Sequence, residues 1–310
     1  MQSSFLLSTV PRFWLGAALG LLLAASSLQA RAALNVVACE PEWASLAKEL
    51  GGDRVNATAA TTASQDPHHI EARPSLIARM RNADLVVCTG LELEVGWLPV
   101  LIRQSGNARL APAAPGNFEA GKFVTPLDLP TRLDRSDGDV HAQGNPHIHL
   151  DPRNIAKVAT ALAARLGQID PANAKIYDER LQSFQARWSA ALQKWQLAAQ
   201  PLQGVAVVAH HKNFTYLWHW LGVREIATLE PKPGVEPSPG HLVALSALLA
   251  RQPAKMVIRA AYEDGRASQW LVEHAKVRAV TLPFTVGGND KSTDLFGLFD
   301  STVSLLLGGA

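Results

Sequence analysis

The chain has 310 residues, with 29 Lys and Arg against 27 Asp and Glu and a formal net charge of +2. This near-neutral balance gives no basic surface for nucleic acid or for an anionic membrane, so we expect neither as a partner. The length is large for one hydrophobic core and suits two lobes.

Residues 1–32 have the pattern of a secretory signal peptide. An apolar run from Phe13 to Leu28 follows Arg12, and Ala30-Arg31-Ala32 then forms an A-x-A cleavage pattern. The run is short for a membrane span of ~20 residues, and no Cys stands at the cleavage point to carry a lipid anchor. We therefore expect export to the periplasm and a mature chain that starts near Ala33.

Residues 33–169 are predicted to form a first α/β lobe. Apolar, strand-like runs alternate with helical patterns: strands are expected at 34–40, 54–62 and 84–90, and helices at 41–52, 74–82 and 94–106. This alternation predicts a parallel sheet covered by helices. The only cysteines, Cys39 and Cys88, lie in two of the strand-like runs. They could pair in an oxidising compartment or serve equally well as small core residues.

Residues 170–200 are expected to form a long linking helix, with Asp170 as the N-cap and Pro171 as the first helical residue. Apolar side chains then recur every three or four residues, at Tyr177, Leu181, Phe184, Trp188, Leu192 and Trp195. An α-helix from Pro171 to Gln200 would be ~45 Å long. The pattern predicts a rigid spine between two lobes, packed through an aromatic stripe.

Residues 201–310 return to the alternation of strands and helices. Strands are expected at 204–211, 225–231, 255–261 and 278–284, and helices at 213–223, 239–252, 267–275 and 293–309. The rhythm is that of the first lobe, and it predicts a second α/β lobe with its own parallel sheet.

Most of the histidines gather in three clusters: His68-His69, His141 with His147 and His149, and His210-His211. Each cluster lies where a strand or loop gives way to a helix, which in open α/β sheets is the edge where ligands bind. Neutral imidazole is a good ligand for Zn²⁺, and three or four nitrogen or oxygen donors make a tetrahedral site. A single histidine would be interpreted as a surface or core residue, but three clusters at matching junctions predict a metal site between the lobes.

Four segments resemble a known family: DPHHIEARPS, NPHIHLDPRN, AHHKNFTYLWHWLG and LEPKPGVEPSPGHL. The chain resembles the zinc- and manganese-binding substrate-binding proteins of bacterial ABC transporters, over essentially the whole mature sequence. The resemblance implies two (βα)4-like lobes with parallel sheets, a long rigid helix that joins them, and one metal ion in the cleft between them. It also implies a monomeric receptor, not an enzyme, that passes the ion to an ABC permease in the inner membrane.

The resemblance further implies three metal ligands. The His of the family's D-P-H-x-(aromatic)-E motif matches His68, with His69 in the variable position, and the His of P-H-x-W-L-D-P matches His147. The spacing of the H-x-x-F-x-Y motif places the third ligand at His211 and not at His210.

The fourth ligand position departs from the family. Many relatives have an Asp straight after the last strand, where this chain has Thr285 or Val286. Asp290 lies a few residues further on and is a candidate ligand, with a solvated loop acid as an equal alternative; a water or Glu71 would otherwise close the site. Three imidazoles with at most one oxygen favour Zn²⁺ over Mn²⁺, which suits oxygen-rich sites. Zinc is therefore expected as the transported ligand, with Mn²⁺ as the alternative.

Further residues are candidates for supporting roles. A ligating imidazole usually donates its other N–H to a carboxylate or carbonyl, and three carboxylates are adjacent in sequence to the ligands: Asp66, Glu71 and Asp151. Glu230 and Arg259 are candidates to line the cleft. His141, in the polar loop at 132–145, is a candidate auxiliary metal-binding residue.

The leading interpretation is a periplasmic high-affinity zinc receptor, and a manganese-specific receptor is its nearest alternative. A zinc hydrolase is the alternative from another class, because His147 and His149 have the H-x-H spacing of amidohydrolase barrels and a metal ion with an open position can activate water. No general base is evident beside that motif. A metal chaperone or storage protein without a permease is not separated from the receptor by sequence.

Overall fold

The computed structural model describes residues 33–132, 138 and 141–308. The predicted signal peptide at residues 1–32 lies outside the described residues, as does part of the polar loop at 132–145. Within the described ranges, no helix combines the length and the apolar character that a membrane crossing requires.

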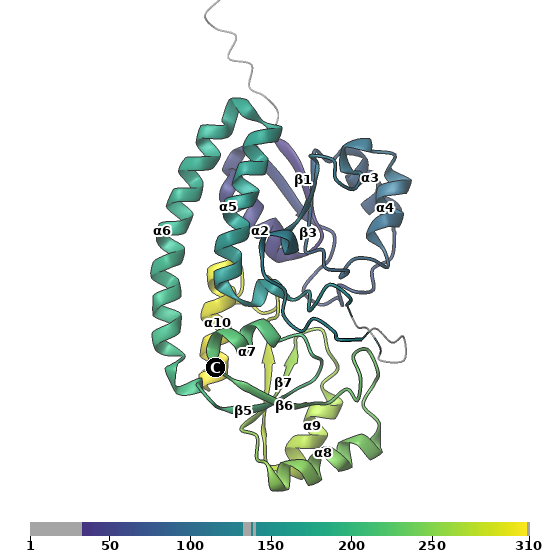
Figure 1. Ribbon diagram of the computed structural model, residues 1–310, viewed down its shortest axis with the longest axis vertical. Helices are drawn as coiled ribbons and strands as arrows, with labels where there is room; N and C mark the ends of the chain where they lie inside the picture. Colours follow the sequence, from purple (N-terminus) through teal and green to yellow (C-terminus); the bar gives the residue numbers. More distant parts are fainter. Residues whose placement is uncertain (1–32, 133–137, 139–140, 309–310) are drawn as a thin grey trace, which may run out of the picture. The chain divides into compact units, whose positions relative to one another are not determined.

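Two four-stranded parallel sheets organise the fold (Figure 1). The first has the strand order β2-β1-β3-β4 and the second the order β6-β5-β7-β8, so both sheets are built in the same way. The predicted fold class, two (βα)4-like lobes with parallel sheets, is confirmed. The first lobe contains β1 (Leu34–Ala38), α2 (Pro41–Gly51), β2 (Val55–Ala59), α3 (Pro74–Asn82), β3 (Leu85–Cys88), α4 (Leu98–Ser105) and β4 (Asn117–Glu119). The second contains β5 (Ala206–Ala209), α7 (Thr215–Leu221), β6 (Arg224–Thr228), α8 (Pro239–Arg251), β7 (Met256–Ala260), α9 (Arg266–Ala275), β8 (Arg278–Leu282) and α10 (Leu295–Leu307).

The central strands are apolar on both sides because helices cover both faces of each sheet. In β5, Val207 packs into the large core cluster, whereas its neighbour Val208 packs with α8 and α9 on the other face. In β1, Val36 and Val37 divide in the same way between two clusters. Successive side chains of a strand point to opposite faces, so an uninterrupted apolar run is what a doubly covered parallel sheet needs.

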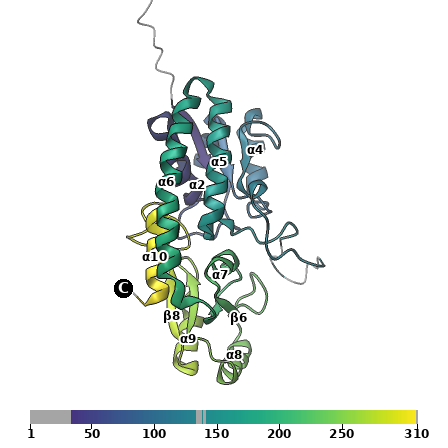
Figure 2. The same ribbon diagram turned by 60° about the vertical axis from the view of Figure 1, so that its left-hand side comes forward.

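Two helices, not one, lie between the sheets in the sequence. The 3-10 turn Pro171–Asn173 separates α5 (Pro152–Ile169), which sequence patterning missed, from α6 (Ala174–Ala198). The long helix thus begins later than predicted, because the Asp170 carboxylate does not cap it and instead accepts hydrogen bonds from Asn173 Nδ2 at 2.6 Å and Tyr177 Oη at 2.9 Å. The two helices run side by side, and Figure 2 shows α2 and α10 next to different stretches of α6.

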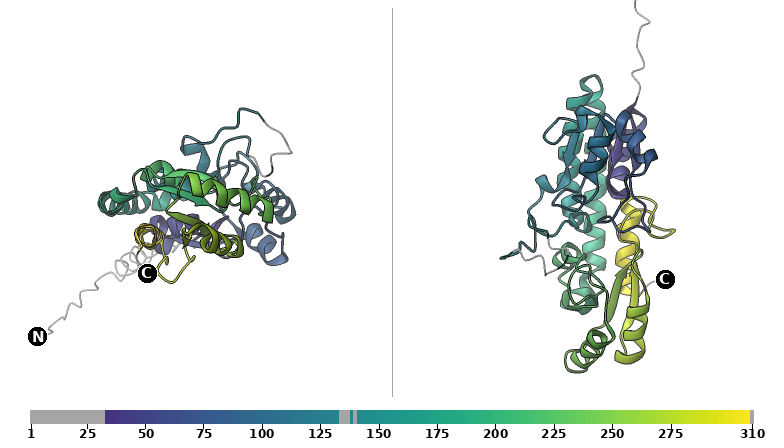
Figure 3. Two further views of the ribbon diagram at one scale, coloured as in Figure 1. Left: turned by 90° about the horizontal axis from the view of Figure 1, so that it is seen from below. Right: turned by 90° about the vertical axis from the view of Figure 1, so that its right-hand side faces the viewer.

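One hydrophobic cluster spans both lobes along α6. It contains Leu46 of α2, Trp188 and Trp195 of α6, Val207 of β5 and Phe299 of α10. Figure 3 shows α10 alongside α6 from a second direction. Because the aromatic stripe is packed against elements of both lobes, their relative position is held by buried apolar contact as well as by the chain connection.

Cys39 and Cys88 form a disulfide. Cys39 directly follows β1, and Cys88 ends β3, its neighbour in the sheet. Both side chains are also part of a buried apolar cluster under α3 and α4. The two cysteines are therefore paired in a disulfide and also serve as small residues of the core, which are the two roles that the sequence left open.

Candidate metal centre

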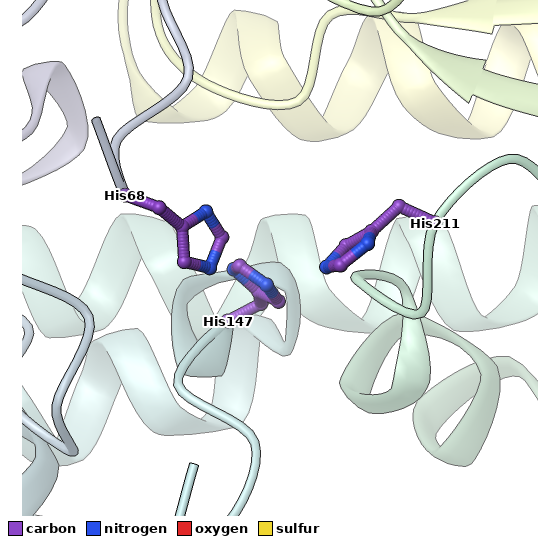
Figure 4. A group of neighbouring side chains, drawn as sticks. All are labelled: His68, His147 and His211. Carbon is purple, nitrogen blue, oxygen red and sulfur yellow. The ribbon is translucent and has the colours of Figure 1, made fainter. Parts of the chain in front are cut away.

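Three imidazoles from three separate segments converge between the lobes (Figure 4). His68 lies in the loop after β2, His147 just before α5, and His211 just after β5. Their ring centroids are 5.4 Å (His68–His147), 5.8 Å (His68–His211) and 6.0 Å (His147–His211) apart. One potential ligand nitrogen from each ring lies within 4.8 Å of those from the other two.

His68 is oriented by Asp66. The Asp66 Oδ1 atom accepts hydrogen bonds from the backbone N–H of His68 at 2.9 Å and from its ring Nδ1 at 2.6 Å. Burial raises the pKa of Asp66, but the hydrogen bond and charge of His68 outweigh it and lower this pKa to about 2. The carboxylate therefore stays ionised and holds the Nδ1 proton, which leaves the Nε2 lone pair of His68 free to bind a metal.

His147 is the most deeply buried of the three rings, with 1% of its surface exposed. Its backbone N–H donates to Asn145 Oδ1 at 3.0 Å, and Asn145 O accepts the Tyr216 hydroxyl at 2.8 Å. Burial and the charge of His68 keep the pKa of His147 well below the ordinary value. The ring is therefore neutral at neutral pH, as a metal ligand must be. Its buried Nδ1 has no hydrogen-bond partner in the described structure.

His211 is paired with the carboxylate of Glu230, and both residues lie in the second lobe. Glu230 Oε2 lies 2.6 Å from His211 Nδ1 and also accepts the Gly234 N–H at 2.9 Å. Burial lowers the pKa of His211, but the hydrogen bond and charge of Glu230 outweigh it and leave the pKa raised. In two of the three rings, those of His68 and His211, Nδ1 is therefore in contact with a carboxylate, and Nε2 is left for the cluster.

A fourth histidine lies beside the three. His141 Nε2 is 3.3 Å from His68 Nε2, and the two rings are stacked with centroids 5.3 Å apart. Burial and the charges of His68 and His211 lower the pKa of His141 to about 4. His141, His147 and His211 line one cavity of roughly 510 Å³ between the lobes.

The structure does not bring Asp290 to this cluster. The position after β8 is taken by Thr285, whose hydroxyl donates to Glu42, while the preceding carbonyl, Phe284 O, lies 3.0 Å from His149 Nε2. These contacts turn the segment toward the first lobe, and Asp290 is left exposed beside Ser301 and Ser304 of α10.

The other predicted supporting residues divide clearly. Asp66 and Glu230 contact the rings of His68 and His211, respectively. Glu71 is exposed, and Asp151 accepts the Arg153 backbone N–H at the start of α5. Arg259 donates to Glu263 O at 2.7 Å and so braces the loop after β7.

The sequence and the fold are both similar to those of known proteins. A family model described as zinc-uptake complex component A, periplasmic (ZnuA), matches residues 36–307. The zinc-binding lipoprotein AdcA of Streptococcus pneumoniae (strain ATCC BAA-255 / R6) is 25% identical over 272 residues, which cover 82% of this chain and 50% of AdcA. The manganese ABC transporter substrate-binding lipoprotein PsaA of Streptococcus pneumoniae is 24% identical, over 68% of this chain and 67% of PsaA. The chain spans about half the length of curated relatives such as AdcA.

A crystal structure of ZnuA has the same fold. It superposes with a TM-score of 0.71 at 22% identity and covers 88% of this chain and 99% of its own. At that identity the likeness concerns the arrangement of the two lobes and the helix beside them.

Proposed function

From the premise that this chain belongs to the family of the zinc-uptake complex component A, periplasmic, we propose that it is a periplasmic receptor that binds one Zn²⁺ for an ABC importer. His68, His147 and His211 are the proposed ligands. The family is described as a component of metal uptake and not as an enzyme, which confirms the expectation of a receptor without enzymatic activity. The family gives no support to the alternative of a zinc hydrolase.

The observation that carries the proposal is the convergence of three ring nitrogens within 4.8 Å of one another. In a tetrahedral zinc site with bonds of 2.0–2.1 Å, neighbouring ligand atoms are about 3.3 Å apart. Small side-chain movements would therefore bring the three nitrogens onto one ion. Asp66 and Glu230 support this use, because each holds the Nδ1 proton of a ring whose Nε2 faces the cluster.

Zinc is proposed over manganese because of the donor atoms. Within the described residues, the converging group contains imidazoles and no carboxylate, whereas manganese suits oxygen-rich sites. Relatives named for zinc and for manganese both match this chain at similar identity, so the donor set carries the choice.

Titration of the mature protein with Zn²⁺ tests the proposal. We expect one equivalent to bind, Mn²⁺ to compete poorly, and His147→Ala to weaken zinc binding by orders of magnitude, because it removes a buried ligand.

The matched control is His69→Ala, which removes the exposed imidazole next to His68 and should leave zinc affinity unchanged, whereas His68→Ala should not. Equal zinc affinity in the wild type and in His68→Ala and His147→Ala would exclude the proposed site, and tighter binding of Mn²⁺ than of Zn²⁺ would exclude the proposed metal.

A further inference from the structure

A short segment, residues 141–145, carries His141 and places its ring beside that of His68; we call this segment the strap. The Ala142 N–H donates to Glu92 Oε2 at 2.6 Å, next to His141, and the Asn145 N–H donates to Leu127 O at 2.8 Å at the other end. A turn closed by the Gly144 N–H and the His141 carbonyl, 3.1 Å apart, connects the two anchors. Gly144 has φ +97°, and a Cβ there would lie 2.7 Å from Leu127 O. The strap is thus fixed by specific contacts.

The distance between His141 and His68 is that of two ligands on one ion. Their Nε2 atoms are 3.3 Å apart, and adjacent nitrogens of a tetrahedral zinc site are separated by about 3.3 Å. His68 Nδ1 is engaged by Asp66, so the two atoms that face each other are the ones available for coordination. His141 also lines the cavity that His147 and His211 line.

Glu92, which accepts the Ala142 N–H of the strap, lies in a turn with an unusual backbone conformation. Gly90, Leu91 and Glu92 have φ values of +74°, +53° and +69°. The left-handed region costs a non-glycine residue about 1 kcal/mol or more. Glu94 holds this turn by accepting the backbone N–H groups of Thr89 at 2.7 Å and Gly90 at 3.0 Å. The strained turn aims the Glu92 carboxylate at Ala142.

We propose that His141 is the fourth protein ligand of the metal ion, and that Glu92 is a positioning residue that holds the strap so that His141 reaches the site. This inference rests on the proposed function and deepens it. It replaces the carboxylate expected from the family with a nitrogen donor, so that the ion is bound by four imidazoles. Three of these ligands belong to the body of the two lobes, and the fourth lies on the strap, which the hydrogen bonds to Glu92 and Leu127 hold beside them.

The experiment measures Zn²⁺ affinity by chelator competition and the visible bands of bound Co²⁺ in the mature protein. His141→Ala should still bind one equivalent, with a loss of affinity of at least the ~10–100-fold that removal of a ligand's hydrogen-bond partner costs. Its Co²⁺ spectrum should change, because an oxygen donor replaces a nitrogen. His69→Ala should match the wild type in both measurements.

Glu92 is tested through its coupling to His141. Glu92→Ala should weaken zinc binding about tenfold, and Glu92→Gln should restore it because the amide oxygen still accepts the Ala142 N–H. In a His141→Ala background, Glu92→Ala should have no further effect, since it acts only through His141.

Wild-type affinity and an unchanged Co²⁺ spectrum in His141→Ala, with binding lost in His147→Ala, would overturn this inference and leave the proposed function standing. Unchanged binding in both variants would instead remove the proposed function.

Discussion

Adjacent histidines in this protein have different surroundings, and the local backbone decides which of each pair faces the cluster. His68 is fixed by an Asp66 carboxylate that binds both its backbone and its ring, whereas His69 is exposed. In the second pair, His211 lies 2.6 Å from Glu230, whereas His210 is buried and lies 4.0 Å from the same carboxylate. In both pairs the converging ring is the one whose Nδ1 is held by an acid.

The Glu230 contact predicts a specific pH dependence of zinc binding. Because Glu230 raises the pKa of His211, a proton competes with the metal there, and affinity should fall as the pH drops through that raised pKa. In Glu230→Gln the His211 pKa falls, so the decline should begin at a lower pH. Above the raised pKa of His211, where protons no longer compete with the metal, the variant should bind zinc about tenfold more weakly, because the carboxylate no longer orients the ring.

Zinc titrations from pH 8 to pH 5.5 would measure both effects. Glu273→Gln, which changes an exposed carboxylate on α9, is the control. Superimposable pH profiles for wild type and Glu230→Gln would show that Glu230 does not tune His211.

At the scale of elements, α6 is held by its aromatic stripe. Tyr177, Phe184, Trp188 and Trp195 are buried, as their spacing predicted. Trp188 also donates its indole N–H to Pro152 O at 2.8 Å, at the start of α5. The stripe thus joins α6 to the helix that follows His147, and so connects the spine to the candidate site.

Trp188→Ala should lower the free energy of unfolding by about 3–5 kcal/mol, since it leaves a large cavity in the core. Leu197→Ala, on the same helix but at a side chain that is 67% exposed, should change it by less than about 0.5 kcal/mol. Chemical denaturation would compare the two. Similar losses in both variants would mean that helix propensity, not packing of the stripe, governs the contribution of α6.

At the scale of the whole molecule, buried carboxyl groups make stability depend on pH. Burial raises the pKa of Glu225 and of Glu263 to about 7, from 4.5. The folded state therefore binds more protons than the unfolded state between these values, and this contribution to stability is lost as the pH rises from about 4.5 to 7. The buried His147 and His141 act in the opposite direction below their ordinary pKa, so a single variant isolates the effect better than the total curve does.

Glu225→Gln should raise the free energy of unfolding at pH 8 by up to about 3 kcal/mol and change it little at pH 4.5. The amide oxygen can still accept the Trp218 indole N–H, which lies 2.8 Å from Glu225 Oε2, so the contact survives while the charge is removed. Denaturation of the metal-free protein at both pH values would test this against the wild type. A variant less stable than the wild type at pH 8 would show that the ionised carboxylate is not a cost to folding.

The two-lobe architecture was predictable because alternating apolar runs and helical patterns depend on near neighbours in the chain. The helix α5 and the strand β4 were missed. The helix α5 begins immediately after the cluster of His141, His147 and His149, and the motif there obscured its helical pattern. The strand β4 has only three residues. The common strand order of the two lobes leaves no repeat in the sequence, because many apolar residues can occupy the same buried position.

The sequence by itself determined the alternation of elements, the aromatic face of the long helix and the histidine motifs, because all of these depend on the spacing of residues that are close in the chain. Only the tertiary structure decided that Glu230 and Asp66 hold the rings, that Asp290 lies elsewhere, and that His141 stands beside His68. The physical reason is the distance along the chain: His141 and His68 are 73 residues apart, and Glu92 and Ala142 are 50 apart. Contacts of that kind exist only once parallel strands and their crossovers have brought the loops to one edge of the fold.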